Sequence, residues 1–346
     1  MLRFALALVL ARSALAAAPA CALERGGSLL LGGGVLNNVT FFPSGRNFLL
    51  ATPPAHAMAP PQGFPLLFVI HGYTDGNAHF LEHTQFATRA TQRGYVVVAP
   101  FGDAAVRGGA WSLGNAPGDG TYDHDKSTLA DELSFLTAVP DCTAALLPPS
   151  MPLSGAIFLA GLSQGGKISC RLACAQMPPR WRVNAMVLAA GIQGEPERAC
   201  SGAPVALLLL YGGLDPVVPL CSTGGFGYRP GASDLLTWAR VYNKCNSAAH
   251  RPTAWCPSGA PWWGTVEGGS AEQRLSTSAY EFVGCAAPTV LLWTPTDSHV
   301  WPMPLLGVGG NATERALDFF QNQRVPPALD TPCELSPPCD MLGNSL

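Results

Sequence analysis

The sequence has little charge and no long uninterrupted run of apolar residues. Only 12% of its 346 residues are charged, and the formal net charge is -3. A disordered chain or a nucleic-acid-binding protein would need more charge or a basic excess, so neither class fits. The apolar run at residues 4–10 falls far short of the roughly 20 residues that a membrane-spanning helix needs. We therefore expect a globular protein with no membrane span and no nucleic-acid partner.

The eleven cysteines show no metal-binding pattern. No C-x-x-C motif is accompanied by a second one or by a histidine pair, so the sequence predicts no zinc site. Eleven thiols would be unusual in a reducing cytosol, whereas five disulfides are normal in an exported protein. Cysteine usage therefore favours a secreted protein, and we expect no metal.

The N-terminus is typical of a secretory signal peptide. One arginine precedes the short apolar run, and alanine-rich small residues follow. Cleavage fits the small-x-small rule after Ala20 and after Ala22. We place the boundary at Ala22, because removal of Cys21 leaves ten cysteines that can all pair. A lipid-anchored Cys21 is a weaker alternative, since Ala18 is a poor match to the bulky residue that a lipobox requires.

Two Asn-x-Thr sequons make Asn38 and Asn311 candidate glycosylation sites in a eukaryotic host. Asn311 also precedes an amphipathic stretch, with Glu314 three residues later, which is the pattern of a helix N-cap. For Asn311 we favour the cap.

Short apolar runs alternate with helical patterns along most of the chain. Apolar runs without polar alternation suit strands that are covered on both faces, and strand–helix alternation implies an α/β fold with a mostly parallel, doubly wound sheet. The predicted strands are 65–70, 95–99, 156–160, 183–190, 205–211 and 289–293. The predicted helices are 79–93, 128–138, a segment ending near residue 175, 233–244 and 312–322.

Three regions fall outside this alternation. Residues 101–127 are rich in glycine, and residues 246–270 carry three tryptophans among Gly and Pro, so we expect both to be loops inserted above the sheet. Residues 329–346 form a Pro-rich tail in which we expect Cys333 and Cys339 to close their own disulfide. The predicted organisation is a signal peptide at 1–22, one α/β domain at 23–328 and this tail.

The pattern Gly161-x-Ser163-x-Gly165 lies where the predicted strand 156–160 turns into a helix. Alone it is weak, since chance predicts roughly a quarter of an occurrence in such a chain. Its position is that of a nucleophile elbow, where any Cβ at the glycines would clash with the neighbouring strand and helix. The N-terminus of the following helix favours a developing oxyanion. Ser163 is therefore the candidate nucleophile.

A phosphate-binding loop is the alternative for the same residues. Gly161 is followed at the right spacing by Gly166 and Lys167, but Ile168 stands where such a loop has Ser or Thr to hold Mg²⁺. A nucleotide site is also out of place in an exported protein, so the elbow fits better.

Asp215 and His299 follow Ser163 in the chain order that is typical of α/β-hydrolases. Each comes after a predicted strand, at the sheet edge where α/β sites gather. A turn is the alternative for Asp215, because Asp-Pro is a good turn former. Asp297 is poorly placed to orient an imidazole two residues away. The sequence thus predicts a Ser163–Asp215–His299 triad.

The segment 71–74 follows the predicted strand 65–70, where a second oxyanion donor is expected. We predict that the backbone N–H groups of Tyr73 and Gln164 form the pair. His71 we interpret as a packed residue that supports this loop.

Trp111 and Trp301, together with the tryptophans at 255–263, are candidates for an aromatic wall of the substrate cleft. For each of them, a packing role is an equally good interpretation.

Four segments, 71–76, 161–174, 215–219 and 299–302, together resemble secreted feruloyl esterases and polyhydroxybutyrate depolymerases. The most telling are Asp-Pro-x-Val-Pro, beginning at Asp215, and His-x-Trp-Pro, beginning at His299. The resemblance covers about 64–322. It implies the α/β-hydrolase fold and cofactor-free hydrolysis of feruloyl or hydroxyalkanoate esters, with polysaccharide-linked or polymeric substrates. It also implies a disulfide between Cys245 and Cys285.

The sequence departs from that family in the candidate site. Gln164 stands where the family usually has Asn, and residues 296–298 replace a glycine run. Two other functions stay open on the same fold, namely a secreted serine peptidase or acyltransferase and a binding protein without catalysis. The presence of Ser163, Asp215 and His299 argues against the last.

Overall fold

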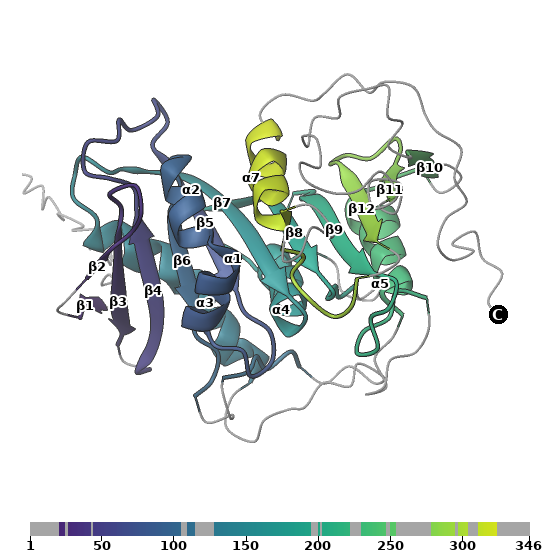
Figure 1. Cartoon of the computed structure of the whole chain (residues 1–346), viewed down its shortest axis with the longest axis horizontal. Coiled ribbons are helices and arrows are strands. Elements are labelled where there is room, and N and C mark those ends of the chain that lie inside the picture. Colours follow the sequence, from purple (N-terminus) through teal and green to yellow (C-terminus); the bar gives the residue numbers. More distant parts are fainter. Residues whose placement is uncertain are drawn as a thin grey trace, which may run out of the picture.

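The computed structural model contains a twelve-stranded mixed sheet with helices on both faces (Figure 1). The residues that the structure describes are 21–24, 27–42, 44–104, 109–114, 128–194, 200, 203–221, 230–246, 250–253, 278–294, 297–303 and 311–323. Cys333, Cys339 and the predicted tail 329–346 lie outside them, as do most of the predicted inserted loops.

The six predicted strands are confirmed and form the parallel centre of the sheet. They are β5 (Phe64–Ile70), β6 (Val96–Pro100), β7 (Leu153–Leu162), β8 (Arg182–Ala189), β9 (Ala206–Gly212) and β12 (Thr289–Thr294). Their order is β6-β5-β7-β8-β9-β12, and all five pairings are parallel. Every residue of β5 and of β9 is buried, which explains their continuous apolar sequence.

Antiparallel strands extend both edges of this centre. On one side lie β1 (Cys21–Leu23), β2 (Ser28–Leu29), β3 (Val35–Phe41) and β4 (Arg46–Thr52), and on the other lie β10 (His250–Thr253) and β11 (Ser278–Phe282). The sequence did not predict these strands. Residues 250–253, expected to belong to an inserted loop, instead form an edge strand that pairs with β11.

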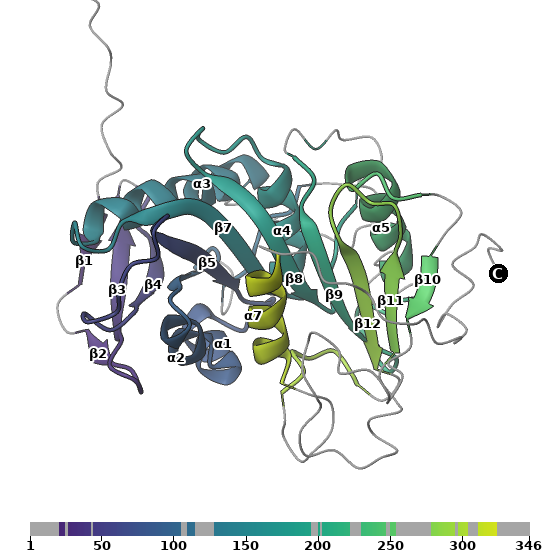
Figure 2. The ribbon, with the colours of Figure 1, turned by 90° about the horizontal axis from the view of Figure 1, so that it is seen from above.

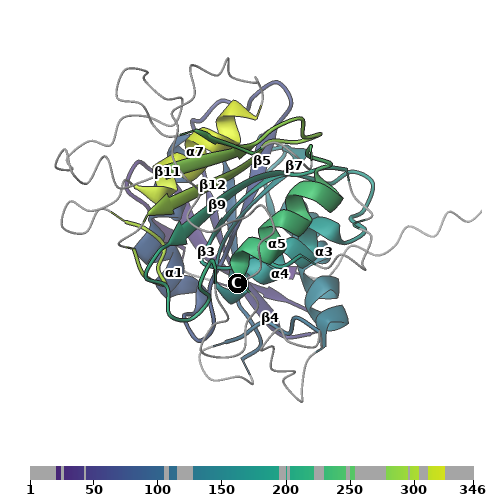
Figure 3. The same ribbon diagram turned by 90° about the vertical axis from the view of Figure 1, so that its right-hand side faces the viewer.

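Helices cover the two faces of the sheet separately (Figures 2 and 3). One face carries α3 (Leu129–Leu146), α4 (Gln164–Cys174) and α5 (Gly231–Thr237), which continues as a π-helical turn, η1 (Trp238–Tyr242). The other face carries α1 (Asn77–Thr84), α2 (Phe86–Gln92) and α7 (Ala312–Asn322). Because α1, α2 and α7 share a face, segments more than 200 residues apart in the chain come into contact there.

Two predicted helices differ from the observed ones. The predicted helix 79–93 is two helices, because Gln85 adopts a left-handed φ of 58° that ends α1 and starts α2. The predicted helix 128–138 starts as expected, with a capping box between Thr128 and Asp131, but continues through Pro140 to Leu146. Its buried face continues beyond the proline, which keeps the segment helical.

Three disulfides connect described cysteines. The expected pair Cys245–Cys285 is confirmed, and Cys174 pairs with Cys200. A third disulfide joins Cys21 to Cys142 in α3 and thereby ties β1 to the domain. Cys221 is also disulfide-bonded.

Cys21 lies in β1 and is bonded to Cys142, which favours the cleavage site after Ala20 over the expected one after Ala22. Among the described cysteines, the unpaired one is Cys170, which is buried in α4. With Cys170 unpaired, ten of the eleven cysteines remain when Cys21 is kept. An even number of cysteines that can pair therefore does not require the removal of Cys21.

The two sequon asparagines have different surroundings. Asn311 is the N-cap of α7, as expected, and its side-chain oxygen accepts from the N–H groups of Thr313 and Glu314. Asn38 lies in β3, where its amide donates to Glu24. Within the described part of the chain, no helix combines the length and the hydropathy needed to cross a membrane.

Candidate active site

Ser163 is the single residue between β7, which ends at Leu162, and α4, which begins at Gln164. Its backbone has φ 54° and ψ -119°, a conformation that L-residues rarely adopt and that costs roughly 1–3 kcal/mol. Hydrogen bonds hold it from both sides, since its N–H donates to Ala189 O at 2.8 Å and its C=O accepts from Lys167 N–H at 3.1 Å. This strained turn between strand and helix is the geometry of a nucleophile elbow.

The glycines around Ser163 are required by close backbone packing. A Cβ on Gly161 would lie 2.6 Å from the carbonyl oxygen of Gly165, and one on Gly165 would lie 2.1 Å from that of Ile70. Gly191, which the sequence analysis did not single out, follows β8, and a Cβ there would lie 2.0 Å from the carbonyl oxygen of Ser163. The elbow therefore depends on glycine in two neighbouring segments.

Asp215 and His299 meet because β9 and β12 are adjacent parallel strands. Oδ2 of Asp215 accepts from Nδ1–H of His299 at 2.8 Å. Its Oδ1 accepts from the backbone N–H groups of Val217 and Val218, both at 2.9 Å. The Asp-Pro turn and the His contact thus use different oxygens of one carboxylate, so the two interpretations of Asp215 are compatible. The carboxylate is fully buried, whereas the imidazole is partly exposed.

Ser163 and His299 line one pocket of about 500 Å³. Tyr73, Gln164 and Trp301 line it as well. The structure therefore brings the predicted nucleophile, base and oxyanion residues to one cavity, with Asp215 directly behind the imidazole.

The predicted oxyanion residues come from two elements. Gln164 is the first residue of α4, so its N–H has no acceptor within the helix. Tyr73 lies in the loop after β5, where Thr74 has a φ of 60° and its N–H donates to Gly109 O at 3.0 Å. The side chain of Gln164 accepts from the backbone N–H of Trp111 at 2.9 Å, so the segment 109–114 contacts both the start of α4 and the Tyr73 loop.

His71 supports this loop from inside the protein, as expected. Its Nδ1 lies 2.7 Å from Gly72 O, and its Nε2 lies 3.0 Å from Gly102 N, which donates to it. Only a neutral imidazole can donate at one nitrogen and accept at the other. Burial lowers the pKa of His71 to about 4, so the neutral form persists over the physiological range.

Of the two candidate wall residues, Trp111 and Trp301, one lines the pocket and the other does not. Trp111 is completely buried and does not line the pocket, so its expected place in the cleft wall is wrong. Its indole N–H donates to His71 O at 2.9 Å, which makes it a support for the loop. Trp301 lines the pocket with an almost fully buried ring that packs edge-on against Phe80 and Phe86.

One wall of the pocket was not anticipated. Asp75, His79 and His83 line it from the start and the exposed side of α1. Nδ1 of His79 lies 2.5 Å from Oδ1 of Asp75, and the rings of His79 and His83 stack with centroids 6.3 Å apart. The spacing of four residues was the available signal, because it places His79 and His83 on one face of α1 and Asp75 just before the helix starts. In the described part of the chain, no group of three His, Cys, Asp or Glu side chains is arranged to hold a metal ion.

Comparisons with known proteins agree with this architecture. No protein-family model matches the sequence. Among solved structures, acetyl xylan esterase from Aspergillus awamori superposes with a TM-score of 0.50, at 13% identity, over 82% of this chain and 95% of that one. The chain has the α/β-hydrolase fold. At this identity the likeness concerns the fold alone.

Other proteins similar to this α/β-hydrolase chain carry related descriptions. The protein named "Putative esterase NocK", from Nocardia uniformis subsp. tsuyamanensis, is 26% identical over 289 residues, which are 78% of this chain and 75% of that one. The poly(3-hydroxybutyrate) depolymerase LpqC from Bordetella parapertussis is 18% identical over 61% of this chain and 78% of that one, with a TM-score of 0.39.

Proposed function

We propose that this chain is a serine carboxylic-ester hydrolase with Ser163 as nucleophile. The observation that carries the proposal is the strained Ser163 backbone in the same pocket as the imidazole that Asp215 holds. A serine hydroxyl is a weak nucleophile until a base takes its proton, and His299, which Asp215 orients in the same pocket, is the residue we assign as that base.

The reaction has two steps. Oγ of Ser163 attacks the ester carbonyl while Nε2 of His299 takes its proton, and the alcohol leaves with a proton from the imidazolium. Water, activated by the same imidazole, then hydrolyses the acyl-enzyme. Asp215 fixes the tautomer with Nδ1–H and stabilises the imidazolium.

The tetrahedral oxyanion binds the backbone N–H groups of Tyr73 and Gln164 in this mechanism. The position of Gln164 at the N-terminus of α4 supports its role, because a helix N-terminus carries partial positive charge. Trp111 and His71 act indirectly, by fixing the two segments that carry the donors.

The substrate class we propose is an ester with an apolar or aromatic acyl group, of the feruloyl or hydroxyalkanoate type. Two exposed apolar side chains that line the pocket, Tyr73 and Val300, support it. The descriptions of the similar proteins, an esterase and an acetyl xylan esterase, support ester hydrolysis. The three disulfides support a secreted protein.

The deciding experiment measures hydrolysis of a short p-nitrophenyl ester by the wild type and by Ser163→Ala. We expect kcat to fall by about 10³-fold or more in the variant, with the melting temperature unchanged. Equal rates would remove Ser163 from the mechanism. A panel of methyl ferulate, acetylated xylan and polyhydroxybutyrate then ranks the acyl groups, and a peptide panel tests the peptidase alternative.

A further inference from the structure

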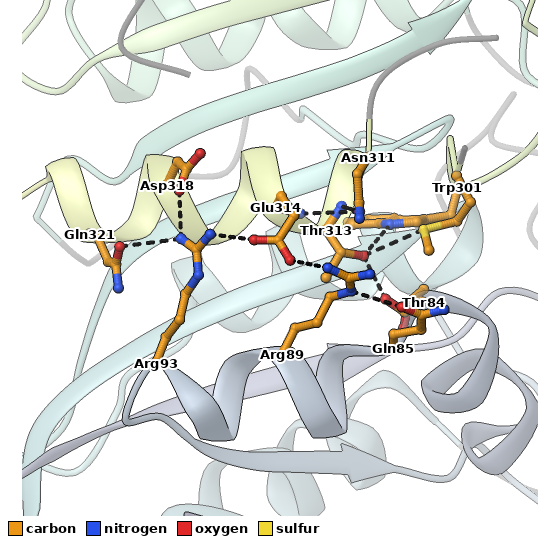
Figure 4. Close-up of polar contacts among 11 residues, drawn as sticks. Thr84, Gln85, Arg89, Arg93, Trp301, Asn311, Thr313, Glu314, Asp318 and Gln321 are labelled. Carbon is orange, nitrogen blue, oxygen red and sulfur yellow. Dashed lines mark hydrogen bonds and ion pairs between the residues drawn. The ribbon is translucent and has the colours of Figure 1, made fainter. Parts of the chain in front are cut away.

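We propose that Thr313, at the start of α7, is a positioning residue for the active site. Its buried hydroxyl bonds at the same time to the loop that carries His299 and to the end of α1, which lines the pocket (Figure 4). The proposal rests on the proposed esterase function and adds a residue that is more than ten positions away from His299 in the chain.

The first bond reaches the His299 loop through Trp301. Trp301 lies two residues after His299, and its indole N–H donates to Oγ1 of Thr313 at 3.1 Å. Both side chains are buried, so water does not replace this bond if it is lost. Phe80 and Phe86 pack against the indole ring and fix its position. The hydrogen bond to Thr313 then fixes the rotation of the ring.

The second bond reaches α1. Oγ1 of Thr313 lies 2.7 Å from the carbonyl oxygen of Thr84, the last residue of α1. A hydroxyl has a single proton, so Thr313 donates to Thr84 O and uses an oxygen lone pair to accept from Trp301. Terminal carbonyls of a helix lack donors within the helix, and this one receives its donor from α7. The same oxygen lies 3.7 Å from Sδ of Met303.

A separate set of contacts holds Thr313 itself in place. Asn311 caps α7 through the N–H groups of Thr313 and Glu314. Arg89 and Arg93 of α2 both pair with Glu314, and Arg93 also pairs with Asp318 at 2.5 Å (Figure 4). These ion pairs dock α7 on α2, so the hydroxyl is presented from a fixed helix.

The consequence is a fixed spacing between the base and the pocket wall. His299 belongs to the loop on one side of the hydroxyl, and His79 and His83 belong to the helix on the other side. Misplacement of a catalytic group by about 1 Å can lower the rate by about 100-fold. Loss of the hydroxyl is therefore expected to lower kcat more than it changes KM.

The test compares Thr313→Val, which keeps the shape and removes the hydroxyl, with Thr313→Ser, which keeps the hydroxyl. With a p-nitrophenyl ester, we expect kcat to fall about 10- to 100-fold for T313V and KM to change by less than about threefold. T313S should keep kcat within about threefold of the wild type. Equal kcat values for T313V and the wild type would overturn the proposal, and so would a T313S variant as impaired as T313V.

Asp141→Asn is the matched structural control. Asp141 lies in α3, on the other face of the sheet from α7, where it pairs with Arg180 and accepts from the indole N–H of Trp181. D141N should lower the melting temperature and keep kcat within about twofold. All variants are assayed at a temperature where circular dichroism shows them folded. If D141N loses as much kcat as T313V, the loss reflects stability alone and Thr313 has only a structural role.

If T313V does not fold, Trp301→Phe removes the same hydrogen bond from the other side, and the expected kcat loss applies to it. A W301F variant with wild-type kcat would overturn the proposal. Failure of the proposed function is distinguishable, because it would show as a wild type that does not hydrolyse the ester or as an active Ser163→Ala variant.

Discussion

Nδ1 of His299 lies 2.8 Å from Oδ2 of Asp215, although 84 residues separate them in the chain. The neighbouring parallel strands β9 and β12 end at the same edge of the sheet, which brings the following loops together. The other carboxylate oxygen is occupied by two backbone N–H groups, so the side chain cannot rotate freely away from the imidazole.

The orientation of this carboxylate makes Asp215→Asn an informative variant. If the amide oxygen replaces Oδ1 as acceptor for Val217 and Val218, the NH₂ group faces Nδ1 of His299. An N–H donor there forces the tautomer whose Nε2 already carries a proton and cannot accept one from Ser163. We expect kcat for a p-nitrophenyl ester to fall by about 10⁴-fold without unfolding.

Asp297→Asn is the control, because Asp297 is the other acid near His299 and has no hydrogen bond to it among the described contacts. It should retain kcat within about threefold. A D297N variant as inactive as D215N would contradict the assignment of Asp215.

Gly191→Ala tests the packing behind the elbow. The added Cβ would lie 2.0 Å from the carbonyl oxygen of Ser163, and neither backbone segment can move without disturbing the sheet. We expect the free energy of unfolding in urea to fall by about 3 kcal/mol or more. Gly72→Ala is the comparison, since the nearest atoms to its Cβ lie at 3.5 Å, and it should cost less than about 1 kcal/mol. Similar losses for both would show that the elbow is more adaptable than its geometry indicates.

His71 predicts a loss of stability on acidification. Its pKa is lowered from 6.5 to about 4 by burial, so between these values the unfolded chain binds a proton that the folded protein does not. The free energy of unfolding is therefore unaffected by His71 above pH 6.5. It falls as the pH drops toward 4, by roughly 3 kcal/mol in total.

Urea unfolding at several pH values between 4 and 7, together with an NMR titration of the His71 ring, checks this expectation. The ring should remain neutral at pH 5.5. A ring that titrates with an ordinary pKa would show that burial is offset by contacts of the charged form.

The Cys21–Cys142 disulfide predicts the N-terminus of a secreted protein. Cleavage after Ala20 keeps Cys21, whereas cleavage after Ala22 removes it, so we expect the mature chain to begin at Cys21. Intact mass and non-reducing peptide mapping decide between the two. Replacing both cysteines by Ala should lower the free energy of unfolding by about 2–5 kcal/mol. A mature chain that begins at Leu23 would contradict this prediction.

The sequence predicts the centre of the fold well and its edges poorly. β5 and β9 are covered by helices on both faces, so their sequences are continuously apolar and easily recognised. β3 contains Asn37 and Asn38 and is mostly half-buried, and β10 contains a proline, as edge strands often do. Neither leaves a clear local pattern.

The same division applies to the candidate site. Ser163, Asp215 and His299 were predictable because each follows a recognisable strand in a known chain order. The contact between Thr313 and the end of α1 depends on how α1 and α7 dock on one face of the sheet, and no local sequence pattern encodes that contact. Trp111 shows the converse, since its residue type suggested a binding wall and only its burial reveals a support.

The separation of 121 residues between Cys21 and Cys142 also orders events during synthesis. At 5–20 residues per second, the second cysteine is made roughly 10 s after the first. During that interval the first thiol has no native partner, and α3 must emerge before the N-terminal strand can be locked to the sheet. Oxidation that is too fast, before α3 emerges, would favour a wrong partner, so the yield of correctly bonded protein should depend on an isomerase.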